Sequence, residues 1–226
     1  MLSARDADAL GAAVQEIGGA GGEAVFLPLD LRLPDAPGRL ADFAMKTFGR
    51  IDIVVNNAGA TKRGDFADLT EEDWADGFAL KFFGAVRLTR AAWPSLKANS
   101  GSLINISGIG GRTPGMHFTI GGSVNAAMLS FTKAMAEAGV RDRVQVNVIN
   151  PGTIRTDRYR KRLAALAAER GLDEPAAEQE FIRAENITRI GEPEDVAALV
   201  AFVASPEGRF LHGALIDIDG GATKTI

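Results

Sequence analysis

The stretch Ile51-Asp52-Ile53-Val54-Val55-Asn56-Asn57-Ala58-Gly59 joins a nearly continuous apolar run to a polar turn that ends in glycine. Such a run predicts a parallel strand that is covered on both faces. Other short runs rich in branched apolar side chains predict strands at 24–27, 102–106, 144–149 and 214–218. The sequence therefore predicts an α/β protein with a parallel sheet, and the polar turn is expected to leave the carboxyl end of one strand.

Segments with helical spacing separate these strands. Leu10, Val14 and Ile17 recur at i, i+4 and i+7, which predicts a helix over about 7–17 that ends at the following glycine pair. Further helices are expected over 37–48, from a capping sequence at Thr70 to about Leu96, along Val124–Met135, and after Pro193. Because no repeat or linker interrupts the alternation, we expect a single domain over residues 1–226.

Composition excludes several classes of protein. The 226 residues are 46% apolar, which is enough to form a core, and the net charge of −4 predicts no binding to nucleic acid. The chain has no cysteine and only two histidines, so neither disulfides nor a metal centre is expected, although a magnesium site made of carboxylates stays open. Since no secretory signal or membrane-spanning run is visible, we expect a soluble, cytoplasmic protein.

Four motifs occur in one order along the chain: Asn56–Gly59, Pro151–Thr156, Arg189–Glu194 and Asp217–Gly221. Together they resemble the short-chain dehydrogenase/reductase family over essentially the whole length. The resemblance implies a Rossmann-like, doubly wound parallel sheet in three α/β/α layers. It also implies a nicotinamide dinucleotide bound at the carboxyl ends of the strands, a small-molecule substrate, and a homodimer or homotetramer.

The resemblance also implies an element that this chain lacks. Family members begin with a strand, a turn of the form TGxxxGxG and a helix, which together hold the pyrophosphate. The sequence begins instead at Met1 with Leu2–Arg5, which resembles the end of the second strand. Two explanations stay open: a misassigned start or a fragment, and a native protein without this element.

The catalytic positions implied by the resemblance are all substituted. Family members use a Ser, a Tyr and a Lys, together with an Asn on the preceding helix. In this chain Gly108, Gly121 and Asn125 take the Ser, Tyr and Lys positions, and Lys81 takes the Asn position. One interpretation is a binding or assembly protein that has lost hydride transfer. The other is a reciprocal exchange, in which Lys81 orients the cofactor and supplies positive charge, with Asn125 opposite.

The exchange supplies no general acid, and three residues are candidates. Ser107 lies one position before the expected serine, His117 lies in a loop, and Tyr159 is the only tyrosine. Each also has an ordinary structural interpretation: a polar strand end for Ser107, a solvated loop for His117, and a distant place in the fold for Tyr159. The glycines at 121 and 122 are expected to leave either a void or room for a larger substrate.

The cofactor positions follow from the same resemblance. Arg5 favours NADP(H) over NAD(H) because a guanidinium can pair with a 2′-phosphate, and its alternative is an exposed arginine at a helix start. Asp30 is expected at the adenine amino group, with a helix N-cap as its alternative. The remaining candidates are Leu31, Asn57, Ala58, Gly59, Pro151, Gly152, Ile154 and Thr156.

Residues 155–190 are predicted to form a mobile, lid-like segment, because they are charged and interrupted near Gly171 and Pro175. Five cations lie between positions 155 and 162: Arg155, Arg158, Arg160, Lys161 and Arg162. A solvated helix face explains such a run, and recognition of an anionic substrate is the alternative.

Overall fold

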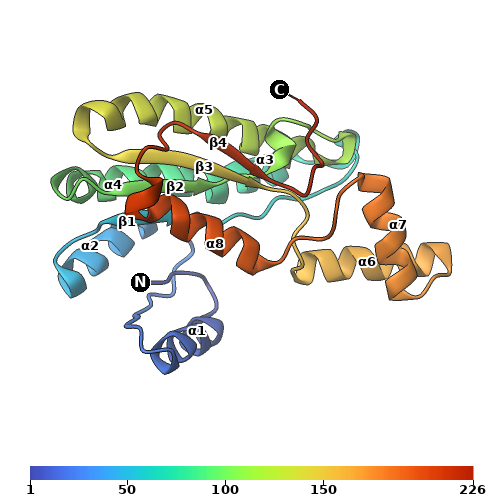
Figure 1. The fold of residues 1–226 in the computed structure, drawn as a ribbon, viewed down its shortest axis with the longest axis horizontal. Coiled ribbons are helices and arrows are strands. Elements are labelled where there is room, and N and C mark those ends of the chain that lie inside the picture. The colour runs from blue at the N-terminus through green and yellow to red at the C-terminus, as the bar shows by residue number, and fades with distance from the viewer. Residues whose placement is uncertain (226) are drawn as a thin grey trace.

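The computed structural model describes residues 1–225 and, within them, one parallel sheet (Figure 1). Neighbouring strands follow the order β1-β2-β3-β4, and Val55 of the first lies opposite Ile104 of the second. The strands are β1 (Ile53–Asn56), β2 (Ser102–Ile106), β3 (Gln145–Pro151) and β4 (Leu215–Ile218). The predicted parallel, Rossmann-like sheet is confirmed.

Helices cover the two faces of the sheet and complete the layers. Helices α4 and α5 pack on one face, α8 packs on the other, and α2 lies beside α4. The helices are α1 (Ala7–Gly19), α2 (Ala36–Phe48), α3 (Glu71–Phe78), α4 (Ala85–Ala98), α5 (Thr119–Asp142), α6 (Asp157–Arg170), α7 (Glu174–Glu185) and α8 (Pro193–Ala204). Alternate residues of β2 therefore enter different cores, with Leu103 toward α4 and Ile104 toward α8.

The helix expected from Thr70 to about Leu96 begins as predicted but is not continuous. The Thr70 side chain accepts the Asp73 backbone N–H, and the Asp73 carboxylate accepts the Thr70 N–H, so the capping box is present. Between α3 and α4, residues Ala79–Gly84 form a π-helical turn. Such turns are frequent at functional sites.

The N-terminal segment forms less β-sheet pairing than the sequence predicts. In place of a full strand at 24–27, a single parallel bridge links Leu2 to Phe26, and neither residue joins the sheet. The prediction that the run at 51–55 is covered on both faces is also wrong. Ile53 and Val55 are 47% and 39% exposed, whereas every residue of β2 is buried. The physical reason is that β1 has a described neighbour on one side only.

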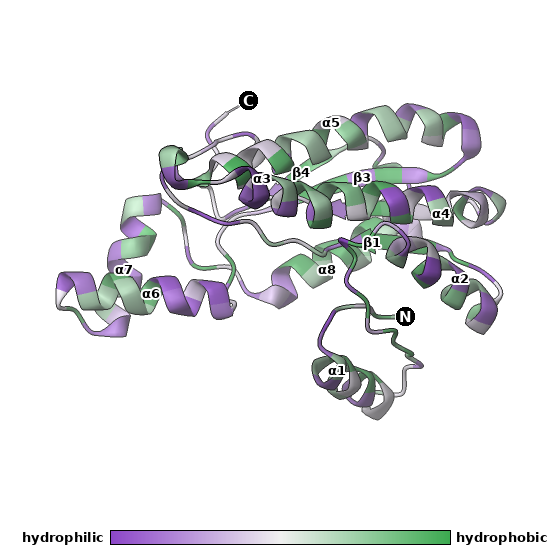
Figure 2. Ribbon diagram, turned by 180° about the vertical axis from the view of Figure 1, so that it is seen from behind, coloured by the Kyte–Doolittle hydropathy of each residue, from purple (hydrophilic) through white to green (hydrophobic). Residues whose placement is uncertain are grey.

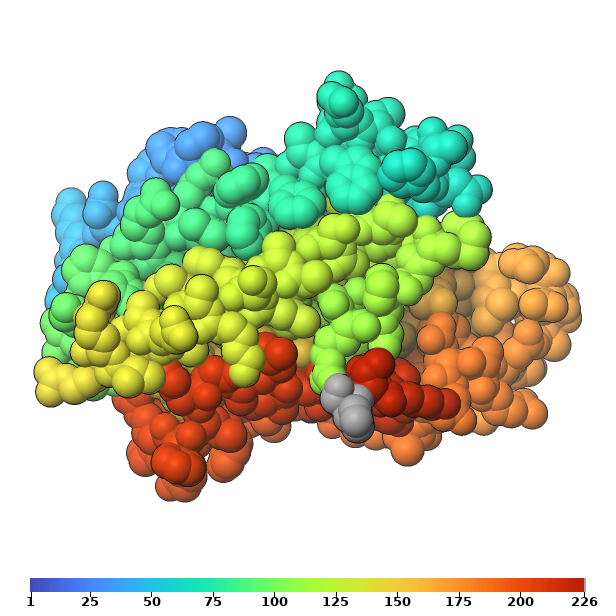
Figure 3. All heavy atoms as spheres, turned by 90° about the horizontal axis from the view of Figure 1, so that it is seen from above, coloured from blue at the N-terminus to red at the C-terminus, as the bar shows by residue number. Residues whose placement is uncertain are grey.

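Residues 155–190 form two helices, α6 and α7. The predicted break is present: Gly171 ends α6 with a left-handed φ of 64°, and Pro175 lies in the first turn of α7. The pair projects at one end of the molecule, and α6 carries hydrophilic stretches (Figures 2 and 3). It encloses a small apolar cluster that includes Tyr159 and Phe181. Mobility of this segment stays a prediction.

Candidate active site

Lys81 projects from the π-helical turn toward the carboxyl end of β2. Its Nζ donates a hydrogen bond of 2.6 Å to the carbonyl oxygen of Ser107, directly after the strand. The stem of Lys81 lies against the turn after β1, since a Cβ atom at Gly59 would be 2.9 Å from its Cδ atom. The structure thus brings together three residues that the sequence places on three separate segments.

The surroundings of Lys81 favour its neutral form. Burial chiefly, and the nearby charge of Arg158 in addition, lower the pKa of the Lys81 ammonium from 10.5 to about 8. A lysine with such a pKa exchanges protons near neutral pH, as a general acid or base must.

Asn125 on α5 reaches the same strand end from the other side. The residue is 4% exposed, and its side-chain amide has no hydrogen-bond partner among residues 1–225. A Cβ atom at Gly108 would be 2.9 Å from Asn125 Nδ2, so this close approach requires glycine. Ser107 Oγ donates to the backbone oxygen of Asn125 at 3.1 Å. The donor and acceptor of this amide are therefore free to bind water or a ligand.

The space above Gly121 is neither a void nor a substrate cavity, contrary to the prediction. The ring of Phe118 fills it, since a Cβ atom at Gly121 would be 2.0 Å from the Phe118 Cζ atom. The guanidinium of Arg63 stacks 4.1 Å from the centre of that ring. An aromatic residue three positions before the glycine is the signal that sequence reasoning missed.

The other two candidate acids lie in different surroundings. His117 is exposed and its Nδ1 lies 2.9 Å from an Asp65 carboxylate oxygen. Tyr159 is 3% exposed and donates its hydroxyl proton to Glu178 at 2.9 Å. Burial, and then the hydrogen bond to Glu178, raise the pKa of Tyr159 to about 12. Tyr159 therefore acts in the packing of α6 against α7.

Several candidate cofactor residues line one cavity beside β1. Arg5, Asp30, Leu31, Asn57 and Ala58 all contribute to its wall.

Asp30 holds the side chain of Arg32, and its expected contact with the adenine amino group stays a prediction. Its carboxylate accepts both the backbone N–H and Nε of Arg32, which, with a smaller contribution from Arg5, lowers the pKa of Asp30. The alternative that Asp30 caps a helix is wrong, because α2 begins at Ala36.

The second group of candidates follows the carboxyl end of β3. A Cβ atom at Gly152 would be 2.8 Å from the Asp219 Cα atom, so the two backbones approach closely. Ile154 forms a parallel bridge with Gly191 and lines a cavity of about 160 Å³. Pro151 ends β3 and Thr156 precedes α6.

The cation run at 155–162 is largely neutralised by neighbouring acids. Arg155 pairs with Glu178 and Glu192, Arg160 with Asp157, and Arg162 with Glu185. Within the described residues, Arg158 and Lys161 have no such partner. The run is therefore mainly a solvated, ion-paired face, and Arg158 is the member whose charge reaches Lys81.

Comparison with known proteins identifies the family. A family described as enoyl-(acyl carrier protein) reductase matches residues 1–223. The chain belongs to the short-chain dehydrogenase/reductase family. This short-chain dehydrogenase/reductase is 36% identical over 225 residues to an uncharacterised oxidoreductase of Mycobacterium tuberculosis, a match that covers 99% of this chain and 82% of the relative.

Two solved structures share the fold of this oxidoreductase. L-sorbose reductase from Gluconobacter frateurii, in complex with NADPH and L-sorbose, is 28% identical to this chain, with a TM-score of 0.94. The match covers 100% of this chain and 87% of the reductase chain. An NADPH-bound short-chain oxidoreductase of Pseudomonas aeruginosa, described as containing an atypical catalytic center, is 26% identical to this chain, with a TM-score of 0.89. The match covers 99% of this chain and 86% of that oxidoreductase. These neighbours support a nicotinamide cofactor.

Two features are absent from residues 1–225. We found no helix that is long and apolar enough to span a membrane. We also found no group of three or more side chains that could hold a metal ion.

Proposed function

We propose that this short-chain dehydrogenase/reductase interconverts a small carbonyl compound and its alcohol with NADP(H), and that Lys81 transfers the proton. The observation that carries the proposal is the convergence of two polar groups on one strand end. The Lys81 ammonium binds the Ser107 carbonyl, and the unpaired Asn125 amide lies against Gly108. The resemblance implies that the reacting carbonyl binds near this strand end, which supports the proposal.

The groups at the carboxyl edge of the sheet fit a dinucleotide. The cofactor, when bound, supplies or accepts the hydride. Arg5 is exposed beside Asp30 and is suited to attract the 2′-phosphate, which favours NADP(H), with NAD(H) as the alternative. The exposed turn Asn57–Gly59 offers its backbone to the ribose, while Pro151–Thr156 would flank the nicotinamide end.

The proton-transfer step follows from the geometry of the ammonium. Protonated Lys81 has three N–H groups, of which Ser107 takes one, so two stay free to donate. During reduction, one of them gives its proton to the substrate oxygen as negative charge develops there. Asn125 would hold the substrate oxygen or a water beside it. Ser107 acts as a positioning residue, because its hydroxyl ties the strand end to α5.

Positive charge around Lys81 favours an anionic substrate. Arg63 and Arg158 make no ion pair within residues 1–225, and the charge of Arg158 lowers the pKa of both Lys81 and Arg63, the latter against an opposing contribution from Glu185. Burial, then the charges of Arg162 and Arg158, lower the pKa of Arg63. Since uncompensated cations repel one another, a bound carboxylate or phosphate ester would stabilise the cluster.

The first test is thermal unfolding of the chain with NADPH and, in parallel, NADH. A ligand at 100 times its dissociation constant stabilises the folded state by about 2.7 kcal/mol. We expect stabilisation by NADPH at lower concentration than by NADH, and we expect Arg5→Gln to remove the difference. If neither nucleotide raises the melting temperature at millimolar concentration, the proposal is wrong for this chain.

The second test separates an enzyme from a binding protein. Carbonyl compounds with and without an anionic group are screened for NADPH oxidation with the wild type, Lys81→Met and Lys133→Met. Lys133 is an exposed lysine on α5 and serves as the matched control. We expect Lys81→Met alone to abolish turnover while nucleotide binding persists. Nucleotide binding without turnover of any substrate would favour the binding or assembly interpretation. The expected dimer or tetramer and the cytoplasmic location stay predictions.

A further inference from the structure

The side-chain nitrogen of Lys81 is held at one point only. The carbonyl oxygen of Ser107 accepts one of its N–H groups at 2.6 Å, directly after β2. Among residues 1–225, Lys62 and Lys97 form ion pairs with carboxylates, whereas Lys81 forms none. A neutral amine has two N–H groups and a lone pair, so a nitrogen that donates once to Ser107 keeps its lone pair free. Lys81 therefore has the geometry of a nucleophile as well as that of a proton donor.

The surroundings of Lys81 populate its neutral amine. Burial and the charge of Arg158 on α6 lower the pKa of Lys81 to about 8, and no charged group of α3, α4 or α5 adds to this shift. About half of the Lys81 side chains are therefore neutral at pH 8, against less than about 1% for an ordinary lysine. A desolvated lysine beside another cation is the arrangement that activates an amine for attack on a carbonyl carbon.

Asn125 supplies an unpaired amide beside the same stretch of backbone. The residue is 4% exposed, and its Nδ2 atom lies against Gly108, the residue after Ser107. No side chain separates the amide from position 110, because a Cβ atom at Gly110 would be 3.5 Å from Asn125 Nδ2. Neither amide atom is among the fully enclosed, unpaired atoms of residues 1–225, so the amide borders accessible space. It is thus placed to donate to an oxygen atom that lies next to Lys81.

Two arginines make this place cationic. The charge of Arg158 acts on both Lys81 and Arg63, since it lowers the pKa of each. Arg63 stacks 4.1 Å from the centre of the Phe118 ring, and that ring lies against Gly110 as the Asn125 amide does. A ligand with a negative group relieves the repulsion among these cations. The carbonyl compound that fits the site is therefore a small one that also carries a carboxylate, which is an oxo acid.

We propose that Lys81 forms a covalent imine with a small oxo acid whose carboxylate binds Arg158. The lone pair of Nζ attacks the carbonyl carbon, so that an N–C bond forms and the carbonyl oxygen takes up one proton from the nitrogen. The resulting hydroxyl group is the one to which Asn125 Nδ2 donates. This hydroxyl and the second N–H proton then leave as water, and a C=N bond remains. One water is released and nothing is oxidised or reduced, so the step needs no other reactant.

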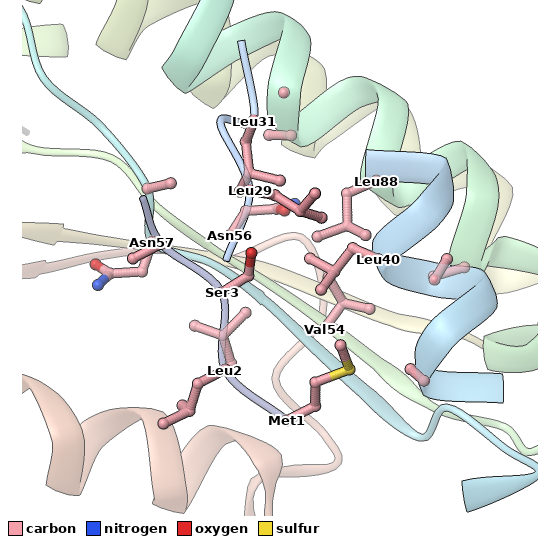
Figure 4. A pocket seen from close by; sticks show the side chains of 18 of the residues that line it. Met1, Leu2, Ser3, Leu29, Leu31, Leu40, Val54, Asn56, Asn57 and Leu88 are labelled. Atoms are coloured by element: carbon pink, nitrogen blue, oxygen red, sulfur yellow. The ribbon is translucent and has the colours of Figure 1, made fainter. Parts of the chain in front are cut away.

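This activity goes beyond the proposed function and uses the other protonation state of Lys81. Proton transfer to a substrate requires the ammonium, whereas imine formation requires the neutral amine. The cavity of about 630 Å³ beside β1, which several candidate cofactor residues line, has Leu80 in its wall but neither Lys81 nor Asn125 (Figure 4). Imine formation is therefore measured without nucleotide, and its failure would leave the proposed function untouched.

The test incubates the full chain with pyruvate and sodium cyanoborohydride, which reduces an imine to a stable secondary amine. Digestion and mass spectrometry then locate and quantify the added carboxyethyl group. We expect Lys81 to be modified at least tenfold faster than Lys133, an exposed lysine on α5. Methyl pyruvate has the same carbonyl group without the negative charge. The ratio of modification at Lys81 to that at Lys133 should be at least tenfold lower with this ester.

Variants of α6 test the part played by Arg158. Arg158→Gln removes the partner of the carboxylate and a positive neighbour of the amine, so it should slow the modification of Lys81 at least threefold. Lys161→Gln removes an exposed cation from the same helix and should leave the rate unchanged. Should Arg158→Gln fail to fold, the comparison of pyruvate with its methyl ester on the wild type measures the effect of the negative charge instead.

Three results would overturn the proposal. The first is an unmodified Lys81 at a pyruvate concentration that modifies Lys133. The second is equal modification of the two lysines, which would mean that the site adds nothing to the reactivity of an exposed amine. The third is the same ratio of modification with pyruvate and with methyl pyruvate, which would exclude recognition of the carboxylate. All three are read from the wild-type chain, so none of them depends on the folding of a variant.

Discussion

The stem of Lys81 lies across the backbone of Gly59, at a place where a Cβ atom would be 2.9 Å from Lys81 Cδ. The turn after β1 and the π-helical turn are thereby in direct contact. The position of the ammonium depends on the absence of a side chain in a loop more than twenty residues earlier in the sequence.

We expect Gly59→Ala to displace Lys81 and lower kcat about ten- to hundredfold, because a small misplacement of a proton donor is costly. Gly64→Ala in the same loop is the control, since a Cβ atom there meets only Leu69 at an ordinary 3.6 Å. Steady-state kinetics on the two variants, with their melting temperatures, checks this. Equal loss of activity in both would assign the effect to the loop and not to Lys81.

The rate of carbonyl reduction should fall as pH rises through about 8, because Lys81 must be protonated to donate and its pKa is lowered to about 8. Removing a positive neighbour raises a lysine pKa, so Arg158→Gln should move this limb to higher pH. The pH profile of kcat measures the shift, and Lys161→Gln, an exposed cation on the same helix, should leave the profile in place.

Gly121→Ala should destabilise the protein by about 1 to 3 kcal/mol, because the added methyl group overlaps the Phe118 ring. Adding Phe118→Ala to Gly121→Ala removes the ring and so makes room for the new methyl group. The double variant should be more stable than the sum of the single effects predicts, by about 0.5 to 3 kcal/mol. Urea unfolding of the four proteins gives this coupling free energy, and strict additivity would show that Phe118 moves aside freely.

Tyr159→Phe should lower the free energy of unfolding by about 1 to 2 kcal/mol, since it removes a hydrogen bond to the Glu178 carboxylate. Turnover should be unchanged, because the Tyr159 hydroxyl binds Glu178 and so holds α6 against α7. Parallel unfolding and activity measurements decide between this role and proton transfer. A variant that folds but has lost turnover would restore Tyr159 as the candidate acid.

Two buried hydroxyls provide a paired test of core polarity. Thr132 Oγ1 accepts a hydrogen bond of 2.9 Å from Asn105, whereas the buried Thr119 Oγ1 has no partner. Thr132→Val should therefore cost about 1 to 3 kcal/mol of stability, and Thr119→Val should change it by less than about 0.5 kcal/mol. Thermal unfolding of the two isosteric variants checks the contrast, which would vanish if Asn105 finds another partner.

Periodicity predicted much of the fold because the signals are local. The cap at Thr70, the break at Gly171 and the strand at 102–106 all lie where the pattern indicated them. The two-sided cover of β1 was not found, because the burial of a strand depends on a neighbour that local sequence does not reveal. For the same reason the run at 24–27 forms only a bridge.

The candidate site was predictable in its members but not in its contacts. Motif spacing pointed to Lys81, Asn125 and Ser107, whose catalytic roles stay predictions. No pattern of single residues indicates that the Lys81 ammonium binds the Ser107 carbonyl, or that Phe118 fills the space above Gly121. Such contacts are set by tertiary packing between segments, whereas propensity and periodicity describe one segment at a time.

Because Lys81 lies in the π-helical turn at Ala79–Gly84, the direction of its side chain depends on the number of residues in that turn. A π-turn holds one residue more than the α-helical turn that it replaces. Deleting one residue from this turn would let α3 and α4 join in a regular helix, and would rotate the preceding residues relative to α4 by about 100°. A single-codon deletion after Lys81 would thus turn Lys81 away from Ser107 although the lysine itself is kept, so that the placement of the proposed proton donor depends on the length of the turn as much as on its composition.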